Sequence, residues 1–353
     1  MNNCEVKAGI ETGEKRRDRA IDGLRAVMIM LIVLLHSCRF GVPWLSGTLG
    51  NLFFFLISGY LLTDSKRWKS FDEGSADADR PGLFVFLWDR LKKIYPAYLL
   101  STAVLFVLGH TKSLILLLAN VALISSGWFW DDETINGPAW FLCVLLIDYI
   151  LFYVLNRFVS RKFRPYVVLI LFLVSFGLGR INLDLPFLYG RTMSGISEFM
   201  LGCLLKYGMN RIPSKLRYPI AAASGVIWAA ALTAAVIFGA DRALIDGGVF
   251  YAVILVPLLV ISTVYGRFIP KCFSLYPLAL LGEKSMYLFI WHVAVQQVLN
   301  IVIGNKGNWF ENIWTELLYL IVLIAFCFGY SRVEGYVRRK VKAMSHSDNE
   351  KSA

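Results

Sequence analysis

An arginine and a histidine share one face of a segment that is otherwise apolar enough to cross a membrane. Arg25 and His36 are eleven residues apart in the stretch IDGLRAVMIMLIVLLH, which begins at Ile21. On a helix, that spacing brings the two side chains within about 20° of one face and separates them by about 16 Å along the axis. A charge inside hydrocarbon costs about 3 kcal/mol or more, so it usually marks a functional site. The pair could therefore bind an anion and transfer a proton.

Both residues also have structural interpretations. His36 could be a packing histidine that hydrogen-bonds a neighbouring helix. Arg25 could form an interfacial ion pair with Asp22, one turn earlier at the start of the helix. The functional alternative is that His36 acts as a general base or acid and that Arg25 faces an anionic ligand from the cytoplasm. Because the two residues share a stripe, we favour the functional interpretation for His36.

A second histidine lies in the middle of another apolar segment. His292 stands in LGEKSMYLFIWHVAVQQ and shares its helical face with Ser285 and Gln296. Two intramembrane histidines favour a polar cavity over isolated packing contacts. His292 is therefore a catalytic candidate beside His36 and Arg25.

Three cations precede a further apolar segment in RLKKIYPAY, which begins at Arg90. They could anchor the cytoplasmic end of a helix, as positive residues commonly do. They could also form a rim that binds the phosphates of a nucleotide-bearing donor. The second interpretation makes Arg90, Lys92 and Lys93 candidate residues for binding a co-substrate.

Two residues, Ser58 and Trp140, could contact a substrate. Ser58 stands in FFFLISGYLL, where small residues more often mark close helix packing, and we expect its neighbour Gly59 to contact the first span. Trp140 could be an interfacial anchor or a surface on which a sugar stacks. The acids Asp148 and Glu198 lie at mid-membrane depth, and we expect each to face the bundle interior, paired or protonated.

The composition identifies a polytopic membrane protein. The 353 residues are 57% hydrophobic and 17% charged, with a mean hydropathy of +0.59. An ordinary soluble domain is about 45–50% apolar and about 25% charged. The net charge of +11 follows from the placement of basic residues at the membrane surface, so it does not indicate a nucleic-acid partner.

The apolar runs predict an all-α transmembrane bundle of about ten spans. The expected spans are 20–39, 48–63, 94–109, 139–156, 165–181, 194–208, 218–239, 248–265, 282–303 and 313–332. The run 113–126 is short for a span, and we expect a re-entrant or interfacial segment there. With these spans, most of the 36 Lys and Arg residues fall on one side of the membrane, and both termini lie on that same side. The positive-inside rule assigns that side to the cytoplasm.

Three regions follow from this division. Residues 1–19 are a polar cytoplasmic tail that we expect to be disordered, 20–335 form the membrane domain, and 336–353 form a basic polar cytoplasmic tail. The first apolar run is long enough to span and follows a polar, basic stretch, so no cleavable signal peptide is expected. Six cysteines are scattered singly, so neither a metal site nor a disulfide framework is expected.

Several ordered motifs resemble those of a known family. They are ID-LR followed by the Arg25–His36 spacing, FFFLISGYL, RLKKIYP, GPAWFL and LGEKSMYLFIWH. In this order and at these membrane depths, they resemble the integral-membrane acyltransferase family 3, bacterial enzymes that O-acylate cell-envelope glycans. The resemblance covers most of the chain.

The resemblance implies a ten-span acyltransferase domain over 20–335. It also implies an acyl-CoA co-substrate, usually acetyl-CoA, that arrives from the cytoplasm, and an acceptor hydroxyl on a lipid-linked or extracytoplasmic saccharide. Arg25 and His36 would be the functional pair, assisted by Arg90 and the lysine that follows it in the motif.

Two positions depart from the family's pattern. Lys93 stands where arginine is usual, which weakens a bidentate phosphate contact. Leu145 stands where many members have a glutamate, and Asp148 is out of register with that position, so we do not assign Asp148 a catalytic role.

The expected protein is a multi-pass O-acetyltransferase of the bacterial inner (plasma) membrane that modifies an envelope polysaccharide. His36, with His292, would remove the proton from a sugar hydroxyl as that hydroxyl attacks the thioester. Direct transfer and a covalent acyl-enzyme on His or Ser both stay open, as do O-antigen, capsule, exopolysaccharide and enterobacterial glycans as acceptors. No metal or permanently bound cofactor is expected, and the partners would be acyl-CoA, the saccharide, the bilayer and other glycan-assembly proteins.

A transporter or flippase that moves a saccharide or acyl group without chemistry is the alternative. About ten spans with buried charges would suit that function as well. The sequence has no pseudo-repeated halves and no paired broken helices of the kind that transporters show, so the enzyme is favoured.

Overall fold

The computed structural model describes residues 3–37, 47–64, 81–109, 113–129, 134–181, 183, 185–237, 250–305, 310 and 312–352. Over these residues the protein is all-helical, as the apolar runs predict. The first helices are α1 (Asn3–Ser37), α2 (Gly47–Asp64), α4 (Leu83–Leu91), α5 (Tyr95–Leu108), α6 (Leu114–Val121), η2 (Gly137–Ala139), α7 (Trp140–Phe158) and α8 (Arg164–Ile181). The others are α9 (Gly190–Arg211), α10 (Ser214–Ile237), η3 (Phe250–Leu255), α12 (Val256–Tyr265), α13 (Phe268–Phe273), α14 (Tyr276–Glu283), α15 (Ser285–Val302) and α16 (Ile313–Ser352).

Five of the described helices are long and apolar enough to cross a membrane. They are Arg19–Ser37, Gly137–Phe158, Arg164–Ile181, Ser285–Val302 and Ile313–Val341. The bent pair α4 and α5, whose axes differ by 66°, makes a sixth if it is one span. Two shorter apolar helices, Leu49–Thr63 and Ala252–Tyr265, fall below that length. The protein is therefore a polytopic membrane protein, but the described helices do not confirm the count of about ten spans, because several apolar segments are short or broken.

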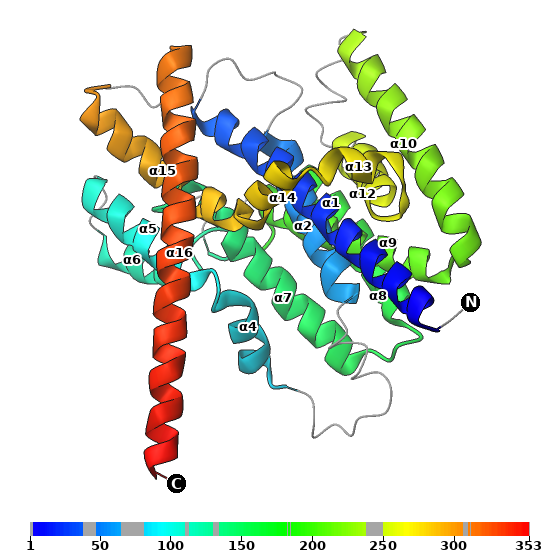
Figure 1. Cartoon of the computed structure of the whole chain (residues 1–353), viewed down its shortest axis with the longest axis horizontal. Coiled ribbons are helices and arrows are strands. Elements are labelled where there is room, and N and C mark those ends of the chain that lie inside the picture. The colour runs from blue at the N-terminus through cyan, green and yellow to red at the C-terminus, as the bar shows by residue number, and fades with distance from the viewer. Residues whose placement is uncertain are drawn as a thin grey trace.

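Helix α1 lies in the middle of the bundle (Figure 1). It packs against α2, α13, α14 and α15, while α2 also packs along α9. Its central residues Ile29, Ile32 and Val33 are completely buried. The helix that carries Arg25 and His36 is thus surrounded by other helices, so both residues can face the interior of the protein.

The packing of α2 against α9 depends on two glycines. A Cβ atom added to Gly59 would lie 2.0 Å from the carbonyl oxygen of Phe199, and one added to Gly202 would lie 2.0 Å from that of Leu56. Small residues permit such close approach of helix backbones. The prediction that Gly59 contacts the first span is wrong, because its partner is α9. Gly50 makes the close contact with α1 instead, since its Cβ would lie 2.7 Å from the Met28 carbonyl oxygen.

Replacing Gly202 by Ala should destabilise the protein, because the new methyl group would clash with backbone atoms of α2. Overpacking of this kind costs about 1–3 kcal/mol. Gly208→Ala is the matched control, since Gly208 lies on the same helix with nothing within 4 Å of the added atom. Thermal unfolding in detergent should show a lower midpoint for Gly202→Ala and an unchanged or higher one for Gly208→Ala. Equal midpoints for the two variants would contradict the close contact of α2 and α9.

The two ends of the chain are more regular than expected. Residues 3–19 continue α1 as helix, where the sequence predicts a disordered tail. Most of 336–353 likewise belongs to α16, which extends well beyond the rest of the bundle in Figure 1. A helix grows more easily than it starts, because the costly nucleus is already formed by the adjoining apolar segment.

The apolar run 113–126 does not form a spanning helix. Its helix α6 has eight residues, which corresponds to a length of about 12 Å. The hydroxyl of Tyr98 donates to the carbonyl of Asn120 at 2.7 Å, and the hydroxyl of Tyr95 donates to that of Val121. The end of α6 is therefore held against the start of α5, as expected for a short re-entrant or interfacial segment.

Candidate active site

The histidines of α1 and α15 lie next to each other. The ring centroids of His36 and His292 are 5.1 Å apart, with an angle of 54° between the ring planes. The side-chain amide of Gln296 donates to the His36 carbonyl oxygen at 2.8 Å, and the hydroxyl of Tyr319 donates to the His292 carbonyl oxygen at 3.0 Å. These bonds fix the backbone of both helices at the point where the rings meet.

Hydrogen bonds also determine which ring nitrogen can accept a proton. Nδ1 of His36 lies 2.8 Å from the Ile32 carbonyl oxygen, and Nδ1 of His292 lies 2.7 Å from that of Phe289. A carbonyl oxygen can only accept, so Nδ1 carries the hydrogen in both rings and Nε2 keeps its lone pair. Nε2 of His292 is buried and has no hydrogen-bond partner in the described part of the chain. Each imidazole is therefore set up as a base at Nε2.

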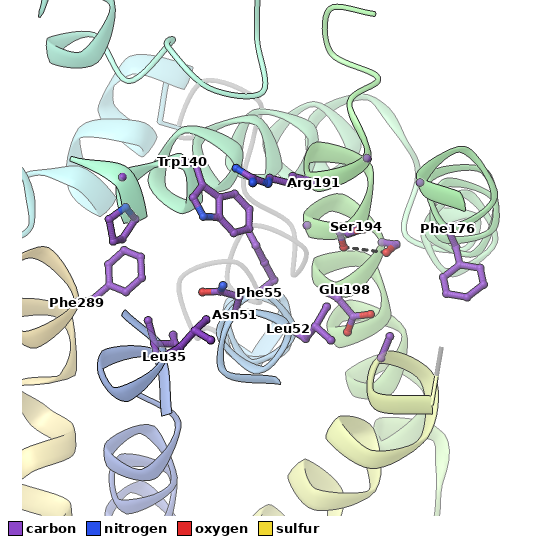
Figure 2. Close-up of a pocket in the computed structure, with 18 of the residues that line it drawn as sticks. Leu35, Asn51, Leu52, Phe55, Trp140, Phe176, Arg191, Ser194, Glu198 and Phe289 are labelled. Atoms are coloured by element: carbon purple, nitrogen blue, oxygen red, sulfur yellow. Dashed lines mark hydrogen bonds between the residues drawn. The ribbon is translucent and has the colours of Figure 1, made fainter. Parts of the chain in front are cut away.

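His36 borders a cavity of about 610 Å³, which we call the histidine cavity. Its walls come from α1, α2, η2, α7, α8, α9, η3 and α15. The residues that line this cavity include His36, Asn51, Phe55, Trp140, Arg180, Arg191, Glu198 and Phe289. Figure 2 shows Trp140 and Arg191 on one side of this space and Asn51, Leu52 and Glu198 on the other. His292 is fully buried behind His36 and is not among the described residues that line the cavity.

A second cavity of about 360 Å³ gathers the cations that the sequence singled out, and we call it the basic cavity. Its described lining includes Arg25 of α1, Arg90 at the end of α4, Lys93 between α4 and α5, Ser58 and one acid, Glu283. Segments far apart in the sequence thus bring three positive charges to one space. The excess of positive charge suits an anionic ligand.

Arg25 both forms the ion pair expected at the start of the helix and lines a cavity. Its guanidinium forms an ion pair with Asp22 at 3.1 Å, one turn earlier on α1, and the same side chain lines the basic cavity. The two side chains are about one-third and one-quarter exposed, so the pair itself contributes little to stability. It instead holds the guanidinium at the edge of the cavity.

Two of the predicted binding residues are placed differently from the rest. Lys92 is exposed, pairs with Asp89 at 2.6 Å, and is not among the described residues that line either cavity. Ser58 lines the basic cavity, but its hydroxyl donates to the Phe54 carbonyl oxygen one turn earlier at 2.7 Å. That bond supports a packing role for Ser58.

Trp140 lies in the wall of the histidine cavity. It begins α7, directly after the short 3₁₀ turn η2. The Arg191 guanidinium lies 5.9 Å from the centre of the indole ring, and the Phe55 ring lies 6.0 Å from it. These contacts hold the indole where an apolar face of a ligand could stack.

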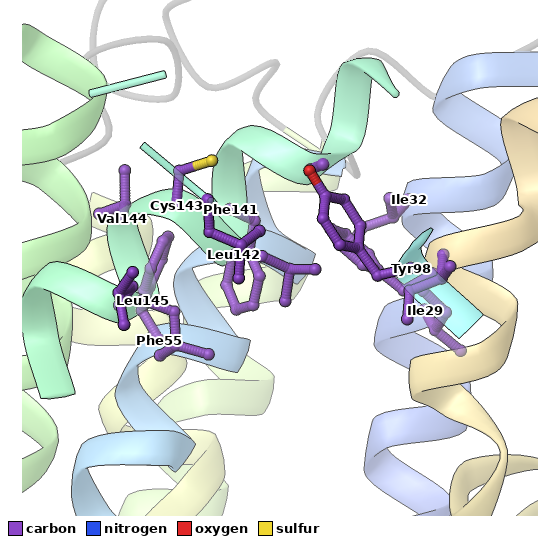
Figure 3. Close-up of a cluster of buried hydrophobic side chains, with 14 of the residues drawn as sticks. Ile29, Ile32, Phe55, Tyr98, Phe141, Leu142, Cys143, Val144 and Leu145 are labelled. Carbon is purple, nitrogen blue, oxygen red and sulfur yellow. The ribbon is translucent and has the colours of Figure 1, made fainter. Parts of the chain in front are cut away.

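Aromatic rings separate the two cavities. Phe55 and Phe289 line the histidine cavity, whereas Phe54 and Phe141 line the basic cavity. The ring of Phe141 lies 4.3 Å from that of Phe55 and 5.3 Å from that of Phe289, between centroids. Figure 3 shows Phe55 and Phe141 within the buried apolar cluster. We call Phe55, Phe141 and Phe289 the aromatic partition.

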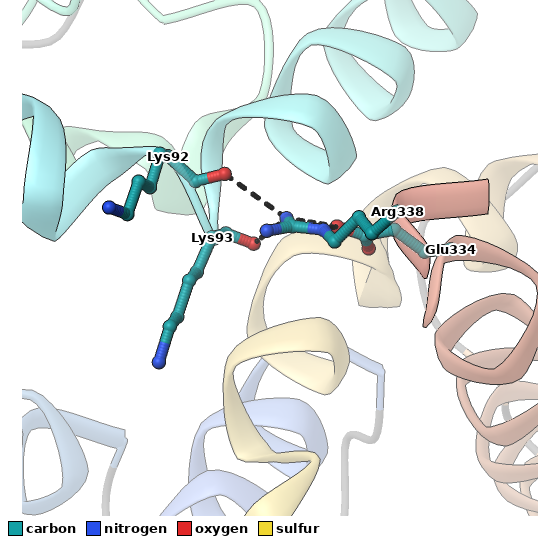
Figure 4. A network of polar contacts seen from close by, with 4 residues as sticks. All are labelled: Lys92, Lys93, Glu334 and Arg338. Carbon is teal, nitrogen blue, oxygen red and sulfur yellow. Dashed lines mark hydrogen bonds and ion pairs between the residues drawn. The ribbon is translucent and has the colours of Figure 1, made fainter. Parts of the chain in front are cut away.

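The C-terminal helix supports the basic motif. Arg338 of α16 donates to the carbonyl oxygens of Lys92 at 3.1 Å and Lys93 at 3.0 Å, and it pairs with Glu334 on its own helix (Figure 4). These carbonyls belong to the break between α4 and α5, where helical hydrogen bonding stops. Arg338 therefore fixes the backbone from which Lys93 reaches the basic cavity.

The sequence did not identify the charged residues that face His36. Arg180 ends α8 and Arg191 begins α9, so both resembled ordinary charges in an external loop. Glu198 was noticed as a buried acid without an assigned role, and it lines the histidine cavity. Asp148 is also completely buried but is not among the described residues that line either cavity. The spacing of residues along each helix could not show which of the two buried acids, Asp148 or Glu198, lines a cavity.

The fold and the site define a polytopic membrane protein in which one histidine of a contacting pair borders one cavity and cations gather in another. Within that class, the chain belongs to the family described as an acyltransferase domain, which matches residues 18–332. The match covers most of the chain and confirms the resemblance drawn from the motifs.

Relatives of the chain include curated proteins named O-acetyltransferase OatA. OatA of Staphylococcus aureus strain NCTC 8325 is 26% identical over 319 residues, which are 79% of this chain and 51% of the relative. OatA of strain MRSA252 matches with the same figures. SACOL0978 of strain COL is 27% identical over 313 residues, 78% of this chain and 50% of the relative. The chain thus spans about half the length of the curated relatives it matches, and no solved structure matches it.

Proposed function

We propose that this protein is a membrane O-acyltransferase that moves an acyl group, by default acetyl, from acyl-CoA to a hydroxyl of a cell-envelope saccharide. The observation that carries the proposal is the His36–His292 pair, with ring centroids 5.1 Å apart and Nε2 of each ring left to accept a proton. Membership of the acyltransferase family supports it. The names of the relatives favour acetyl as the group transferred.

The basic cavity is the proposed site for acyl-CoA as substrate. Coenzyme A carries several phosphate charges, and Arg25, Arg90 and Lys93 supply the opposite charge. Arg90 can bind a phosphate through two parallel N–H groups, whereas Lys93 acts as a point charge. Lys92 has no part in this site. Placing the thioester at the aromatic partition would bring it toward His36 on the other side.

His36 is the proposed general base. Its Nε2 takes the proton of the acceptor hydroxyl while the oxygen attacks the thioester carbonyl carbon. The new C–O bond forms, the C–S bond breaks, and the coenzyme A thiolate leaves with a proton returned from the imidazolium. His292 stands against His36 from the buried side and fixes the ring. A covalent acyl group on Nε2 before transfer also fits this arrangement.

We further propose about ten spans in the bacterial inner membrane, with both termini and the basic cavity on the cytoplasmic side. The distribution of Lys and Arg along the sequence supports this orientation. The short helices Leu49–Thr63 and Ala252–Tyr265 would count among the spans. Arg25 and His36 would then lie near opposite membrane surfaces, and the acceptor would reach His36 through the histidine cavity.

The test uses membrane vesicles that contain the full chain, acetyl-CoA labelled in its acetyl group, and polysaccharide extracted from the envelope of the host. Free coenzyme A thiol and labelled polysaccharide are measured together. An enzyme should release one thiol for each acetyl group transferred. Movement of saccharide across the vesicle membrane without thiol release would identify the transporter instead.

Replacing Arg338 by Gln should weaken the use of acetyl-CoA without abolishing transfer. Two hydrogen bonds to carbonyls, each worth about 1 kcal/mol, no longer hold the backbone of Lys92 and Lys93. We expect the half-saturating concentration of acetyl-CoA to rise about 3- to 10-fold. The neighbouring exposed residue Arg339, changed to Gln, is the control and should leave it unaltered. If the two changes had equal effects on this concentration, Arg338 would have no specific role in positioning Lys93.

A further inference from the structure

Glu198 is a buried carboxylate that the mechanism does not yet use. Its side chain is 1% exposed, and neither carboxylate oxygen has a hydrogen-bond partner in the described part of the chain. Buried polar atoms are nearly always hydrogen-bonded, so each exception needs a reason. Glu198 lines the histidine cavity, so a ligand in that cavity can supply the missing donors.

Among the described residues, neighbouring donors are directed elsewhere than to Glu198. The hydroxyl of Ser197 donates to the Ser194 carbonyl oxygen at 2.8 Å, as the dashed line in Figure 2 marks. Arg180 interacts with Glu198 electrostatically, while its guanidinium lies 5.1 Å from the Phe176 ring. Arg180 thus contributes an opposite charge, but the hydrogen-bonding capacity of the Glu198 carboxyl group is kept for the cavity.

The other walls of the histidine cavity limit the class of ligand. Arg180 and Arg191 can donate hydrogen bonds, Asn51 can both donate and accept, and Trp140 offers an aromatic surface. A carboxylate needs donors from its ligand, and it repels phosphates. A lipid chain would leave it without hydrogen bonds. The volume of about 610 Å³ falls in the usual range for pockets that hold a small ligand.

A sugar ring with neighbouring hydroxyls meets all of these requirements. Two adjacent hydroxyls can donate to the two carboxylate oxygens, and their oxygens can accept from arginine. The apolar face of the ring can stack on Trp140. A phosphate-rich ligand suits the basic cavity better than the histidine cavity, because the described lining residues include three cations and one acid in the basic cavity but two cations and one acid in the histidine cavity.

We propose that Glu198 is the residue that selects the acceptor, by accepting hydrogen bonds from neighbouring hydroxyls of a sugar ring while another hydroxyl faces His36. This inference rests on the proposed O-acyltransferase function and assigns Glu198 to the acceptor alone. Arg180 and Arg191 donate to oxygens of the same sugar. Glu198 therefore controls the affinity for the saccharide and not that for acetyl-CoA.

The experiment compares Glu198→Gln with wild type in membrane vesicles, using host envelope polysaccharide and labelled acetyl-CoA. Glutamine keeps the shape but replaces one accepting oxygen by a donor. We expect the half-saturating concentration of polysaccharide to rise about 10- to 100-fold, because two hydrogen bonds to a charged group are altered. The half-saturating concentration of acetyl-CoA should stay at its wild-type value.

Two further variants make the result decisive. Asp148→Asn is the matched control, because Asp148 is equally buried, also lacks a hydrogen-bond partner among the described residues, and is not placed in either cavity. It should leave saturation by polysaccharide unchanged. Glu198→Asp keeps the carboxyl group and should give an intermediate rise in the half-saturating concentration of polysaccharide. It can replace Glu198→Gln in the test if that variant does not fold.

An unchanged half-saturating concentration of polysaccharide in folded Glu198→Gln would overturn the role of Glu198, and so would an equal rise for acetyl-CoA. Failure of the wild-type protein to release coenzyme A would instead overturn the proposed function. The two failures are therefore distinguished by the wild-type measurement.

Discussion

Replacing His36 by Asn should lower the rate of acetyl transfer by about 10²- to 10⁴-fold, the contribution typical of a general base. Asparagine can still donate a hydrogen bond to the Ile32 carbonyl oxygen, which Nδ1 of His36 contacts at 2.8 Å. It has no nitrogen lone pair that accepts a proton at neutral pH. The change therefore removes the proposed base and keeps the local helix contact. The rate is measured as labelled acetyl in envelope polysaccharide, at matched protein levels.

The control for His36 is His346→Asn, which changes a histidine in the C-terminal tail and should leave the rate unaltered. The thermal unfolding midpoint of each variant in detergent checks that the fold is retained. Transfer at the wild-type rate by folded His36→Asn would show that another group removes the proton. Because His292 lies beside His36, it would be the first candidate to test.

Replacing Arg90 by Ala should raise the half-saturating concentration of acetyl-CoA about 10- to 100-fold. Arg90 lines the basic cavity with Arg25 and Lys93, and hydrogen bonds between a guanidinium and a phosphate contribute about 1.5–3 kcal/mol. Each 1.4 kcal/mol corresponds to a factor of about ten in affinity. Saturation by polysaccharide should change little, because the acceptor is proposed to enter the other cavity. Initial rates at varied acetyl-CoA concentration measure the effect.

Lys92 provides the matched control for Arg90. It belongs to the same basic motif, but its ammonium group is exposed and pairs with Asp89. Lys92→Ala should therefore leave the half-saturating concentration of acetyl-CoA within about two-fold of wild type, the size expected for an exposed ion pair. If Lys92→Ala and Arg90→Ala have equal effects, general positive charge near the membrane surface explains the data, and the basic cavity is not the donor site.

Local spacing predicted which side chains line internal cavities better than it predicted which helices pack together. The eleven-residue separation of Arg25 and His36 correctly put both side chains toward the interior, and the structure assigns them to two different cavities. The contact of His36 with His292 joins helices more than 250 residues apart, so periodicity alone could not establish it. The same limit explains why Lys92 was grouped with Arg90 and Lys93.

The packing partner of Gly59 was also beyond the reach of sequence patterns. A glycine in an apolar helix indicates a close contact, but it does not identify the opposing helix.

The membrane spans are also difficult to predict from the sequence. An apolar run of the right length can fold as a broken pair, as α4 and α5 do, or begin with a π-helical turn, as the segment ending in α12 does. Their geometry depends on neighbours, which a hydropathy profile does not include.

The aromatic partition has a consequence for the membrane voltage. With the two cavities reaching inward from opposite surfaces, as proposed, most of the voltage falls across the thin layer around Phe55, Phe141 and Phe289. Moving one elementary charge through that layer involves about 2.3 kcal/mol per 100 mV. Acetyl transfer exchanges the acetyl group for the hydroxyl proton, which passes through His36 to the coenzyme A thiol, so no net charge crosses the layer, while the coenzyme A phosphates remain on their own side. The protein would thus export a chemical group at any resting voltage and without an ion leak.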